Sequence, residues 1–539
     1  MSNLTLARLL ILLPGVALIV FDLWRARRSD ESRTLADKLL LLIAVANVIG
    51  VGYLVIRQFN FPLHLDLMEG TVLQHFVRAS NGEAIYPEAA PEYVPLAYNV
   101  GYYVFSIPFG WIFGVNVGTL RLVALLGMIG SVGIVTASVW QYTRSRWWSV
   151  LGLGLFAAAY WAMDAYLNTA HSDSWFLFTA LLGSYIISRS RAYPGRIAAV
   201  FLLVAAFWFK QHGAWFTIGG VLFLTWQEMH ETNWRSGAFR SWPYWVIAAV
   251  FGPGLYLLLG PTLFGSDYHY FTLTVPGAWS ELSIQTFLRL GSFIFRNYLI
   301  LAIISGLSVL WVVFRRIQDL SIWQTQVVFA VLAGFMGALD SGSSNNVFIP
   351  MGAFFIIVGT QALYTASMQI TPVKNYRLHM FALLGSFAIF LFDPAPFLTS
   401  PQAADVYEDF VATMQALDGP LYAPWQAYLG DEELALYPGA HWVAIEDMIR
   451  GPGHETKNHP VTRAMLEPLL SPTGPAYMLT NKPLENWPMF MFLLDYLVIE
   501  EDFQERFIAL ELPPKRFDHG YPRYLYRYDP ELAASMSNS

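Results

Sequence analysis

The chain alternates between long apolar stretches and short polar loops. A helix needs about 20 apolar residues to cross the hydrocarbon core of a bilayer, and stretches approaching that length recur as far as residue 393. The candidate spans, about 13 in number and several of them short, lie at 5–23, 38–57, 95–115, 119–140, 147–163, 173–188, 195–209, 213–227, 243–262, 294–314, 322–339, 346–366 and 378–393. This pattern predicts an α-helical polytopic membrane protein with about 12–13 transmembrane helices.

Lysine and arginine residues in the short loops predict the orientation of these spans, because basic loops stay in the cytoplasm. Six loops are basic: Arg25–Arg33, Arg144–Arg146, Arg189–Arg196, Arg235–Arg240, Arg315–Arg316 and Lys374–Arg377. The first basic run follows span 5–23, whereas a cleavable signal peptide carries its positive charge in front, so we expect a retained anchor. The outward-facing segments are then 58–94, 164–172, 210–212, 263–293, 340–345 and everything after about 394.

One part of this topology is inconsistent. The segments 95–115 and 119–140 cannot both cross the membrane if 58–94 lies outside and Arg144–Arg146 lies in the cytoplasm. Either one of the two segments is partly re-entrant, or the two arginines depart from the charge rule. The sequence leaves both alternatives open.

The composition supports a membrane protein and excludes several other classes. Of the 539 residues, 55% are hydrophobic and 13% are charged, about half the charged share of a soluble domain, and the mean hydropathy is +0.43. These values exclude a disordered chain, a coiled coil and an ordinary cytosolic enzyme. The chain contains no cysteine, which excludes disulfides, thiolate metal ligands and a cysteine nucleophile. It shows no basic stripe, so we expect no nucleic acid partner.

The net charge of −7 is unevenly distributed along the chain. Residues 396–539 carry 21 acidic and 9 basic side chains, a net charge of −12, whereas residues 1–395 carry 18 and 23, a net charge of +5. The tail mixes helix-like and strand-like stretches, at 405–417, 462–470, 476–480 and 521–528. We therefore expect two domains, a membrane domain at 1–395 and an extracytoplasmic soluble α+β or α/β domain at 396–539.

The first outward loop, 58–94, carries two carboxylates, Asp66 and Glu69. If 64–80 is helical, the two lie three residues apart on one face, opposite apolar residues, as in an amphipathic helix at a membrane interface. Desolvation at a membrane surface raises the pKa of a carboxyl group, which suits a general base. The alternative is a solvated helix face with no chemical role.

Two further outward loops carry polar residues, which are costly in so apolar a chain and usually have a purpose. His171 and Asp173 stand at the start of a span, and the alternative to a site role is that Ser172 or Asp173 caps the following helix. The loop from Asp340 to Asn346 is rich in glycine, serine and asparagine, and its backbone donors could hold a phosphate. Neither motif is specific by itself.

A polar turn, Lys210-Gln211-His212, separates two short apolar segments. The lysine needs an anionic partner there, unless its side chain reaches the membrane interface. In the tail, segments 423–426 and 441–442 either line an acceptor path or belong to ordinary core and surface. Taken together, the outward loops place acids, a lysine, histidines and amides on one side of the membrane.

These loops resemble the motifs of the polytopic GT-C glycosyltransferases, which include protein O-mannosyltransferases and lipid A aminoarabinose transferases. That family has an acidic motif in its first outer loop, then a Gly-x-x-x-Tyr stretch and a Pro-Leu-x-Tyr segment before the next helix. The matching residues are Asp66 and Glu69, Gly82 and Tyr86, Pro95, Leu96 and Tyr98, Phe113-Gly114 with Leu120-Arg121, Lys210-Gln211, and Asn345 or Asn346 with Pro350. The resemblance covers about 60 to 400. The family's acidic residues are adjacent, whereas Met68 precedes Glu69 here.

The resemblance implies a glycosyltransferase that moves a hexose or pentose from a polyprenyl-phosphate donor to a glycan, lipid or protein acceptor. The reaction would take place on the outer face of a membrane, in a bacterium the inner or plasma membrane. Asp66 or Glu69 would act as the catalytic base, and a single attack at the anomeric carbon would invert its configuration. Which of the two carboxylates is the base stays open.

The resemblance also implies roles for the other loops. The donor phosphate would be bound by Lys210, Gln211, His212 and Asn345. The supporting residues would be His171, Asp173, Tyr98 and Asp340. We assign no metal ligand and no cofactor, although two carboxylates could hold a divalent cation.

A transporter or flippase of lipid-linked saccharides is the alternative from another functional class. Transporters show inverted repeats and charged residues near the membrane midplane. No internal repeat is visible here, and the polar residues gather at one interface, so the pattern favours an enzyme. The same convergence disfavours a non-catalytic membrane scaffold.

Overall fold

The computed structural model describes residues 3–26, 35–340, 343–369, 378–424, 434–452, 467, 474–487, 490–503 and 522–529. The described part is mostly helical, with a small sheet near the end of the chain. The predicted fold class, an α-helical polytopic membrane protein with an α+β region at its C-terminal end, is confirmed. Four features of the sequence lie outside the described residues: the basic loops at 27–33 and 374–377, the segment 425–426, and 462–470 apart from residue 467.

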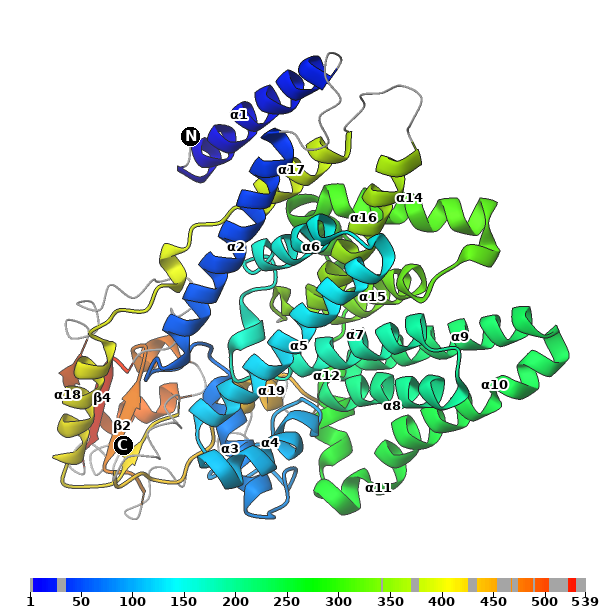
Figure 1. Ribbon diagram of the computed structural model, residues 1–539. Coiled ribbons are helices and arrows are strands. Elements are labelled where there is room, and N and C mark those ends of the chain that lie inside the picture. Colours follow the sequence, from blue (N-terminus) through cyan, green and yellow to red (C-terminus); the bar gives the residue numbers. More distant parts are fainter. Residues whose placement is uncertain are drawn as a thin grey trace.

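The helices of the membrane part run back and forth between the two ends of a bundle (Figure 1). The α-helices are α1 (Asn3–Ala26), α2 (Leu35–Phe59), α3 (Glu69–Ser80), α4 (Gly101–Phe113), α5 (Val117–Thr143), α6 (Arg146–Ala158), α7 (Asp173–Arg189), α8 (Tyr193–Phe209), α9 (Ala214–Glu231), α10 (Trp234–Ala249), α11 (Leu255–Phe264), α12 (Val275–Trp279), α13 (Ile284–Phe293), α14 (Leu299–Arg315), α15 (Ile322–Ala338), α16 (Ile349–Gln369) and α17 (Leu378–Phe390). Short 3-10 and π-helical turns connect several of them, among them η2 (Gln211–Gly213), η3 (Val250–Gly254), η5 (Ile294–Tyr298) and η7 (Asn345–Phe348).

Six helical stretches of the described chain are long and apolar enough to cross a membrane. They are Leu4–Asp22, Leu35–Phe59, Val117–Thr143, Trp234–Phe264, Ile284–Arg315 and Asn345–Met368. The fourth and fifth join two α-helices through the π-helical turns η3 and η5, and Pro253 inside η3 cannot donate an ordinary helical hydrogen bond. These stretches make the protein an integral membrane protein, with the shorter apolar helices packed among them.

The segment 95–140, whose topology the sequence leaves open, contains one long helix and one short one. Helix α4 has 13 residues and is therefore about 20 Å long, too short to cross a bilayer. Helix α5 has 27 residues and is long enough. Helix α4 lies beside α3 at the end of the bundle that carries the first loop (Figure 1). A single crossing by α5 therefore fits both the loop 58–94 and the arginines at 144–146.

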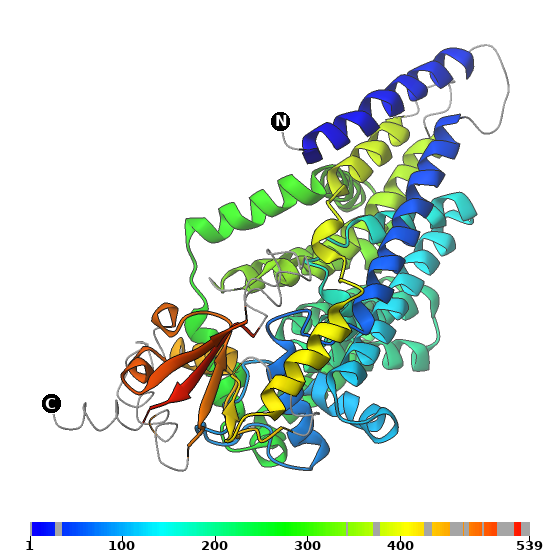
Figure 2. The same cartoon turned by 90° about the vertical axis from the view of Figure 1, so that its left-hand side faces the viewer.

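The C-terminal region begins after α17 and contains a four-stranded sheet. Its elements are α18 (Ala403–Gln415), β1 (Leu421–Tyr422), α19 (Trp442–Ile449), β2 (Tyr477–Thr480), β3 (Leu497–Asp502) and β4 (Tyr524–Tyr528). The strand order is β1-β2-β4-β3, with β1 parallel to β2 and the other pairs antiparallel. Strands β2 and β4 match the predicted strand-like stretches 476–480 and 521–528. Figures 1 and 2 show this sheet and α18 at the end of the molecule opposite α1.

Candidate functional site

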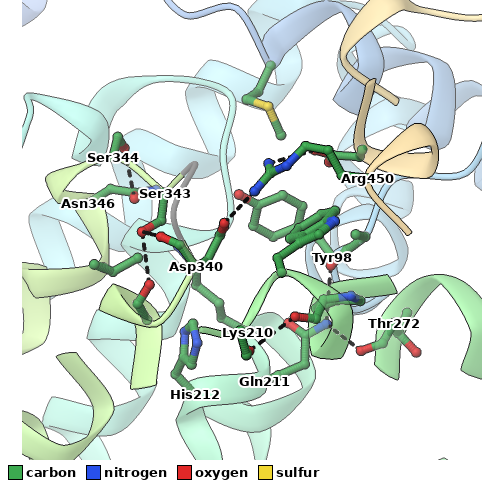
Figure 3. A pocket seen from close by; sticks show the side chains of 18 of the residues that line it. Tyr98, Lys210, Gln211, His212, Thr272, Asp340, Ser343, Ser344, Asn346 and Arg450 are labelled. Atoms are coloured by element: carbon green, nitrogen blue, oxygen red, sulfur yellow. Dashed lines mark hydrogen bonds and ion pairs between the residues drawn. The ribbon is translucent and has the colours of Figure 1, made fainter. Parts of the chain in front are cut away.

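A cavity of about 700 Å³ opens where the ends of the helices meet the C-terminal region. Each segment that the sequence places outside contributes to its wall, and α19 closes one side (Figure 3). The lining includes Leu67, Met68, Tyr98, Tyr166, His171, Lys210, Gln211, His212, Thr272, Trp279, Asp340, Ser343, Asn346, Trp442, Glu446, Asp447 and Arg450. Residues separated by hundreds of positions in the sequence thus meet at one end of the bundle.

Asp173 is the centre of a buried polar cluster in the wall of this cavity. Lys210 Nζ lies 2.8 Å from Asp173 Oδ1. The other carboxylate oxygen contacts the His171 ring and accepts a hydrogen bond from Asn346 Nδ2 at 3.1 Å. All four side chains are buried. Asp173 is also the first residue of α7, so the positive end of the helix dipole favours its charge. The anionic partner that the sequence predicts for Lys210 is therefore Asp173.

The position of Lys210 depends on a tight turn between α8 and α9. Lys210 has an extended backbone (φ −153°, ψ 132°), which ends α8, and η2 follows at once. Gly213 closes the turn against α8, because a Cβ there would lie 2.2 Å from the carbonyl carbon of Ala206. The turn directs the ammonium group toward Tyr98, whose ring centre is 5.6 Å from Nζ. A cation at this distance is attracted by the face of the ring.

Gln211 and His212, the other residues of this turn, also line the cavity. Gln211 Nε2 donates to the carbonyl oxygens of Ala97 at 3.3 Å and Thr272 at 3.1 Å, which ties the turn to two other walls. Burial, and then the charge of Lys210, lower the pKa of His212 to about 4. The ring is therefore neutral at pH 7, so it can donate or accept a hydrogen bond but adds no charge to the site.

The C-terminal region contributes a second cation, Arg450, which directly follows α19. Its guanidinium Nη2 lies 2.7 Å from Asp340 Oδ1, and its centre lies 4.7 Å from the centre of the Trp279 ring. The Arg450 and Asp340 side chains are 29% and 24% exposed, respectively. This ion pair (Figure 3) therefore remains open to the cavity, whereas the cluster around Asp173 is buried.

Asp447, one turn before Arg450, is the most strongly perturbed acid in the cavity wall. Burial raises the pKa of this carboxyl to about 8; Arg450 opposes the shift, and Asp340 and Glu446 add to it. The distance between Arg450 Nη1 and Asp447 Oδ1 is 4.0 Å, too long for a hydrogen bond. Asp447 is thus protonated at pH 7 and leaves the charge of Arg450 largely uncompensated from this side.

Glu69 does not lie in the cavity, and it does not share an exposed helix face with Asp66. Its Oε1 accepts from Arg121 Nε at 3.0 Å and from the Ala170 amide at 2.9 Å. Its Oε2 accepts from Arg121 Nη2 at 2.6 Å and from the Leu65 amide at 2.7 Å. Burial disfavours the charge, but Arg121 and these hydrogen bonds outweigh it and hold the pKa of Glu69 below its usual value. The expected amphipathic helix over 64–80 starts only at Glu69, because this carboxylate folds back onto the amide of Leu65.

Asp66 precedes α3 and is also buried, directly before two residues of the cavity wall, Leu67 and Met68. One of its oxygens accepts from the Met68 amide at 3.4 Å. Its charge reaches the cavity: burial raises the pKa of Tyr98 well above its usual value, and nearby carboxyl groups, Asp66 among them, raise it further. The other three are Asp447, Asp173 and Asp340. The Tyr98 ring therefore lies within electrostatic range of all four carboxyl groups.

The loop after Asp340 presents Asn346 to the cavity rather than Asn345. The Asn345 side chain is exposed, and its backbone amide donates to Asp164 Oδ2 at 2.7 Å. The expectation that Asn345 binds the donor phosphate therefore does not match its position. Arg289 Nη2 donates to the carbonyl oxygens of Ser343 and, at 3.0 Å, Ser344, so this arginine supports the loop from behind. Residues 341 and 342 lie outside the described part of the chain.

Sequence reasoning missed the contribution of α19. Arg450 and Asp447 belong to no recognisable motif, and for the segment 441–442 the sequence leaves open an acceptor path or ordinary core and surface. Trp442 lines the cavity, whereas His441 begins α19 by accepting from the Val443 amide at 3.3 Å. The only signal for α19 was its amphipathic pattern, which does not show what the helix packs against. Within the described ranges, no group of three or more His, Asp or Glu side chains is arranged to hold a metal ion.

The helical bundle, the cavity at the end that meets the C-terminal region, and the sheet define a polytopic membrane protein with the GT-C fold. The similarity that establishes this fold is to ArnT from Cupriavidus metallidurans in the apo state, with 13% identity, a TM-score of 0.53, and coverage of 90% of this chain and 98% of that one. The predicted GT-C resemblance is thereby confirmed at the level of the fold.

Two further solved structures are similar over much of the chain. ArnT from Cupriavidus metallidurans bound to undecaprenyl phosphate has 12% identity and a TM-score of 0.47, with coverage of 91% of this chain and 98% of that one. The Archaeoglobus fulgidus oligosaccharyltransferase, in complex with zinc and sulfate, has 10% identity and a TM-score of 0.41, with coverage of 87% and 69%. A scan against protein-family models and a search of curated proteins find no match.

Proposed function

We propose that this protein is a membrane glycosyltransferase that moves a sugar from a polyprenyl-phosphate donor to an acceptor hydroxyl group. The observation that carries the proposal is the cavity itself, in which cations and carboxyl groups face one another at the end of an apolar bundle. A lipid phosphate needs this combination, with hydrocarbon beside the isoprenoid chain and positive charge at its headgroup. The fold, shared with a lipid A aminoarabinose transferase, agrees with it.

Lys210 is the proposed ligand of the donor phosphate. Its ammonium group has three N–H donors, and the contact with Asp173 uses one of them. The remaining donors are available to phosphate oxygens, with Gln211, the neutral His212 ring and Asn346 beside them. The phosphate group gains negative charge when the sugar leaves it, so a fixed cation stabilises the transition state more than the ground state.

Asp66 is the proposed base. Both oxygens of Glu69 already accept hydrogen bonds from Arg121 and from two backbone amides. Protonating Glu69 would therefore weaken the contacts that hold the first loop in place. Asp66 would accept the proton of the acceptor hydroxyl while that oxygen attacks the anomeric carbon. The bond from this carbon to the phosphate oxygen breaks, its electron pair leaves with the polyprenyl phosphate, and the configuration at the anomeric carbon inverts.

The proposal also includes the orientation. The cavity end of the bundle faces the extracytoplasmic side, because the four basic loops that the structure describes in full, at 144–146, 189–196, 235–240 and 315–316, lie at the other ends of the helices. Residues 396–539 then form an extracytoplasmic domain, and in a bacterium the membrane is the inner or plasma membrane. The acceptor is a glycan, a lipid or a protein that reaches the cavity from this side.

The test is transfer by the purified protein in vesicles supplied with radiolabelled polyprenyl-phosphate sugars and an envelope extract as acceptor. We expect labelled product from the wild type, almost none from Lys210→Met, and wild-type yield from Lys38→Met, an exposed lysine of α2 near the other end of the bundle. The same vesicles report whether an intact donor crosses the membrane. If the wild type moves the donor across the membrane but transfers no sugar, and Lys210→Met abolishes that movement, the protein is a flippase and the proposed transferase function is wrong.

A further inference from the structure

The C-terminal region contributes one positively charged side chain to the cavity, Arg450, which belongs to no recognisable sequence motif. Arg450 is the only arginine in the described lining of the cavity, and Lys210 is its only lysine. The two come from opposite walls, since Lys210 lies between α8 and α9 whereas Arg450 follows α19. Figure 3 shows both side chains directed toward the cavity, with Asp340 and Tyr98 between them.

Arg450 contacts the Asp340 carboxylate through one guanidinium nitrogen. Only Nη2 of the guanidinium reaches Asp340, at 2.7 Å, although an arginine has five N–H donors in a fork that suits two-point binding. Both side chains are partly exposed, at 29% and 24%. An ion pair of this kind contributes little to stability, because water screens it and competes for both partners. It can therefore be exchanged for another anion at small cost.

The surroundings of Arg450 favour an incoming anion over its resting partner. The Trp279 ring fixes the plane of the guanidinium from one side at 4.7 Å. On another side lies Asp447, which is protonated at pH 7 and does not compete for the charge. A phosphate monoester or diester oxygen pair matches the free edge of the guanidinium, and it brings more negative charge than the one carboxylate it would replace.

We propose that Arg450 is a second ligand of the donor phosphate and that Asp340 is its resting counter-ion, which the phosphate displaces on entry. This inference rests on the proposed function and adds to it that the C-terminal region takes part in donor binding. The alternative role for the ion pair is a structural latch, which fastens α19 to the loop after α15.

The two roles predict opposite results for Asp340→Asn. If the pair is a latch, removing either partner loosens the same contact, and both variants lose stability and donor affinity together. If Asp340 competes with the phosphate, Asp340→Asn frees Arg450 and removes a repulsive charge, so the affinity for the phosphate rises. The sign of this one change separates the two roles.

The experiment measures binding of undecaprenyl phosphate and of undecaprenol to the purified full-length protein in detergent. We expect the wild type to prefer the phosphate, Arg450→Gln to lose about tenfold of that preference, Arg450→Lys to lose less, and Asp340→Asn to gain severalfold. Arg523→Gln, which removes an exposed ion pair with Asp502 (3.3 Å) in the same region, serves as the control and should match the wild type. Thermal unfolding of each variant verifies that it is folded.

The outcomes separate this inference from the function on which it rests. An undiminished preference for the phosphate in both Arg450 variants, or a weaker preference in Asp340→Asn, would overturn the role of Arg450 and leave the proposed donor intact. If the wild type binds undecaprenyl phosphate and undecaprenol equally well, the proposed polyprenyl-phosphate donor is wrong, and the role of Arg450 is wrong with it.

Discussion

Two buried ion pairs of this protein each join a carboxylate to a cation, but they have opposite relations to the cavity. Glu69 and Arg121 are joined by two parallel hydrogen bonds, and backbone amides take up the remaining capacity of the carboxylate. Asp173 and Lys210 are joined by one contact, and the lysine faces a cavity. In the first pair the hydrogen bonds within the protein occupy both oxygens of Glu69. In the second pair the Lys210 ammonium group keeps N–H donors that a ligand can use.

The difference follows from the two cations. A guanidinium presents its donors as a rigid fork that matches one carboxylate, so the pair with Glu69 is saturated, and the spare donors of Arg121 reach the carbonyl oxygens of Phe61 and Leu63 (2.8 Å). An ammonium group spreads three donors around a point and cannot satisfy them all on one oxygen. Burial alone therefore does not identify a functional charge; the number of unused donors facing a cavity does.

The largest effect that this comparison predicts is on folding. Glu69→Gln or Arg121→Met leaves a buried charge without its partner, which costs about 3–5 kcal/mol. We expect either variant to unfold at a clearly lower temperature in detergent and to lose transfer with the fold, and the double variant to recover part of the stability. Thermal unfolding followed by tryptophan fluorescence measures this. If both single variants unfold at the wild-type temperature, the Glu69–Arg121 pair is not needed for stability, and its contrast with the Asp173–Lys210 pair is wrong.

Asp66→Asn should abolish chemistry without comparable damage to the fold. Loss of a general base lowers the turnover number by about 10²–10⁴, while the amide still accepts the hydrogen bond from Met68. Single-turnover transfer with saturating donor measures the chemical step. If Asp66→Asn transfers at the wild-type rate, the base is one of the carboxylates that line the cavity, and Asp340 is the next to test.

Lys210→Met should lower transfer by about 10²–10³, the usual cost of removing one group that stabilises a developing charge. It also destabilises the protein, but less than the changes at Glu69, because Asp173 keeps His171 and Asn346 as partners. The double variant Lys210→Met/Asp173→Asn should regain stability but not activity. Recovery of both would make this pair as purely structural as Glu69 and Arg121.

The smallest predicted effect is a pH dependence set by Asp447. Its raised pKa of about 8 means that the carboxyl is neutral below pH 8 and ionised above it, where its charge competes for Arg450. The groups that face it are Arg450, Asp340, Glu446, Tyr98 and Tyr103. We expect binding of undecaprenyl phosphate to weaken severalfold between pH 7 and 9, and Asp447→Asn to remove this dependence.

The same carboxyl links pH to stability. Because its pKa is higher in the folded than in the unfolded chain, the folded state holds the extra proton between about pH 4 and 8, and the stability from this group falls as pH rises through that window. Asp447→Asn should therefore raise the unfolding temperature at pH 8 more than at pH 5. An equal shift at both values would contradict the raised pKa.

The sequence predicted the helices well because their apolar stretches carry the signal themselves. It also predicted that Lys210 needs an anionic partner, since a lysine between spans is costly. It did not show that the partner is Asp173, that Glu69 turns inward onto Arg121, or that α4 is too short to cross. Those outcomes depend on contacts between distant segments, such as Asp340 with Arg450, and no local pattern encodes a contact across 110 positions.

The place of α19 in the cavity wall has a consequence for how the protein is made. Arg450 leaves the ribosome about 240 residues after Lys210, a delay on the order of 10–50 s at ordinary rates of synthesis. Late in that interval the helical segments that contribute to the cavity wall have been synthesised, but the side of the cavity that α19 forms does not yet exist. In the proposed orientation, the α19 segment must also be exported before it can dock. A nascent chain therefore cannot capture donor lipid in a finished site before the α19 segment has been exported and has docked.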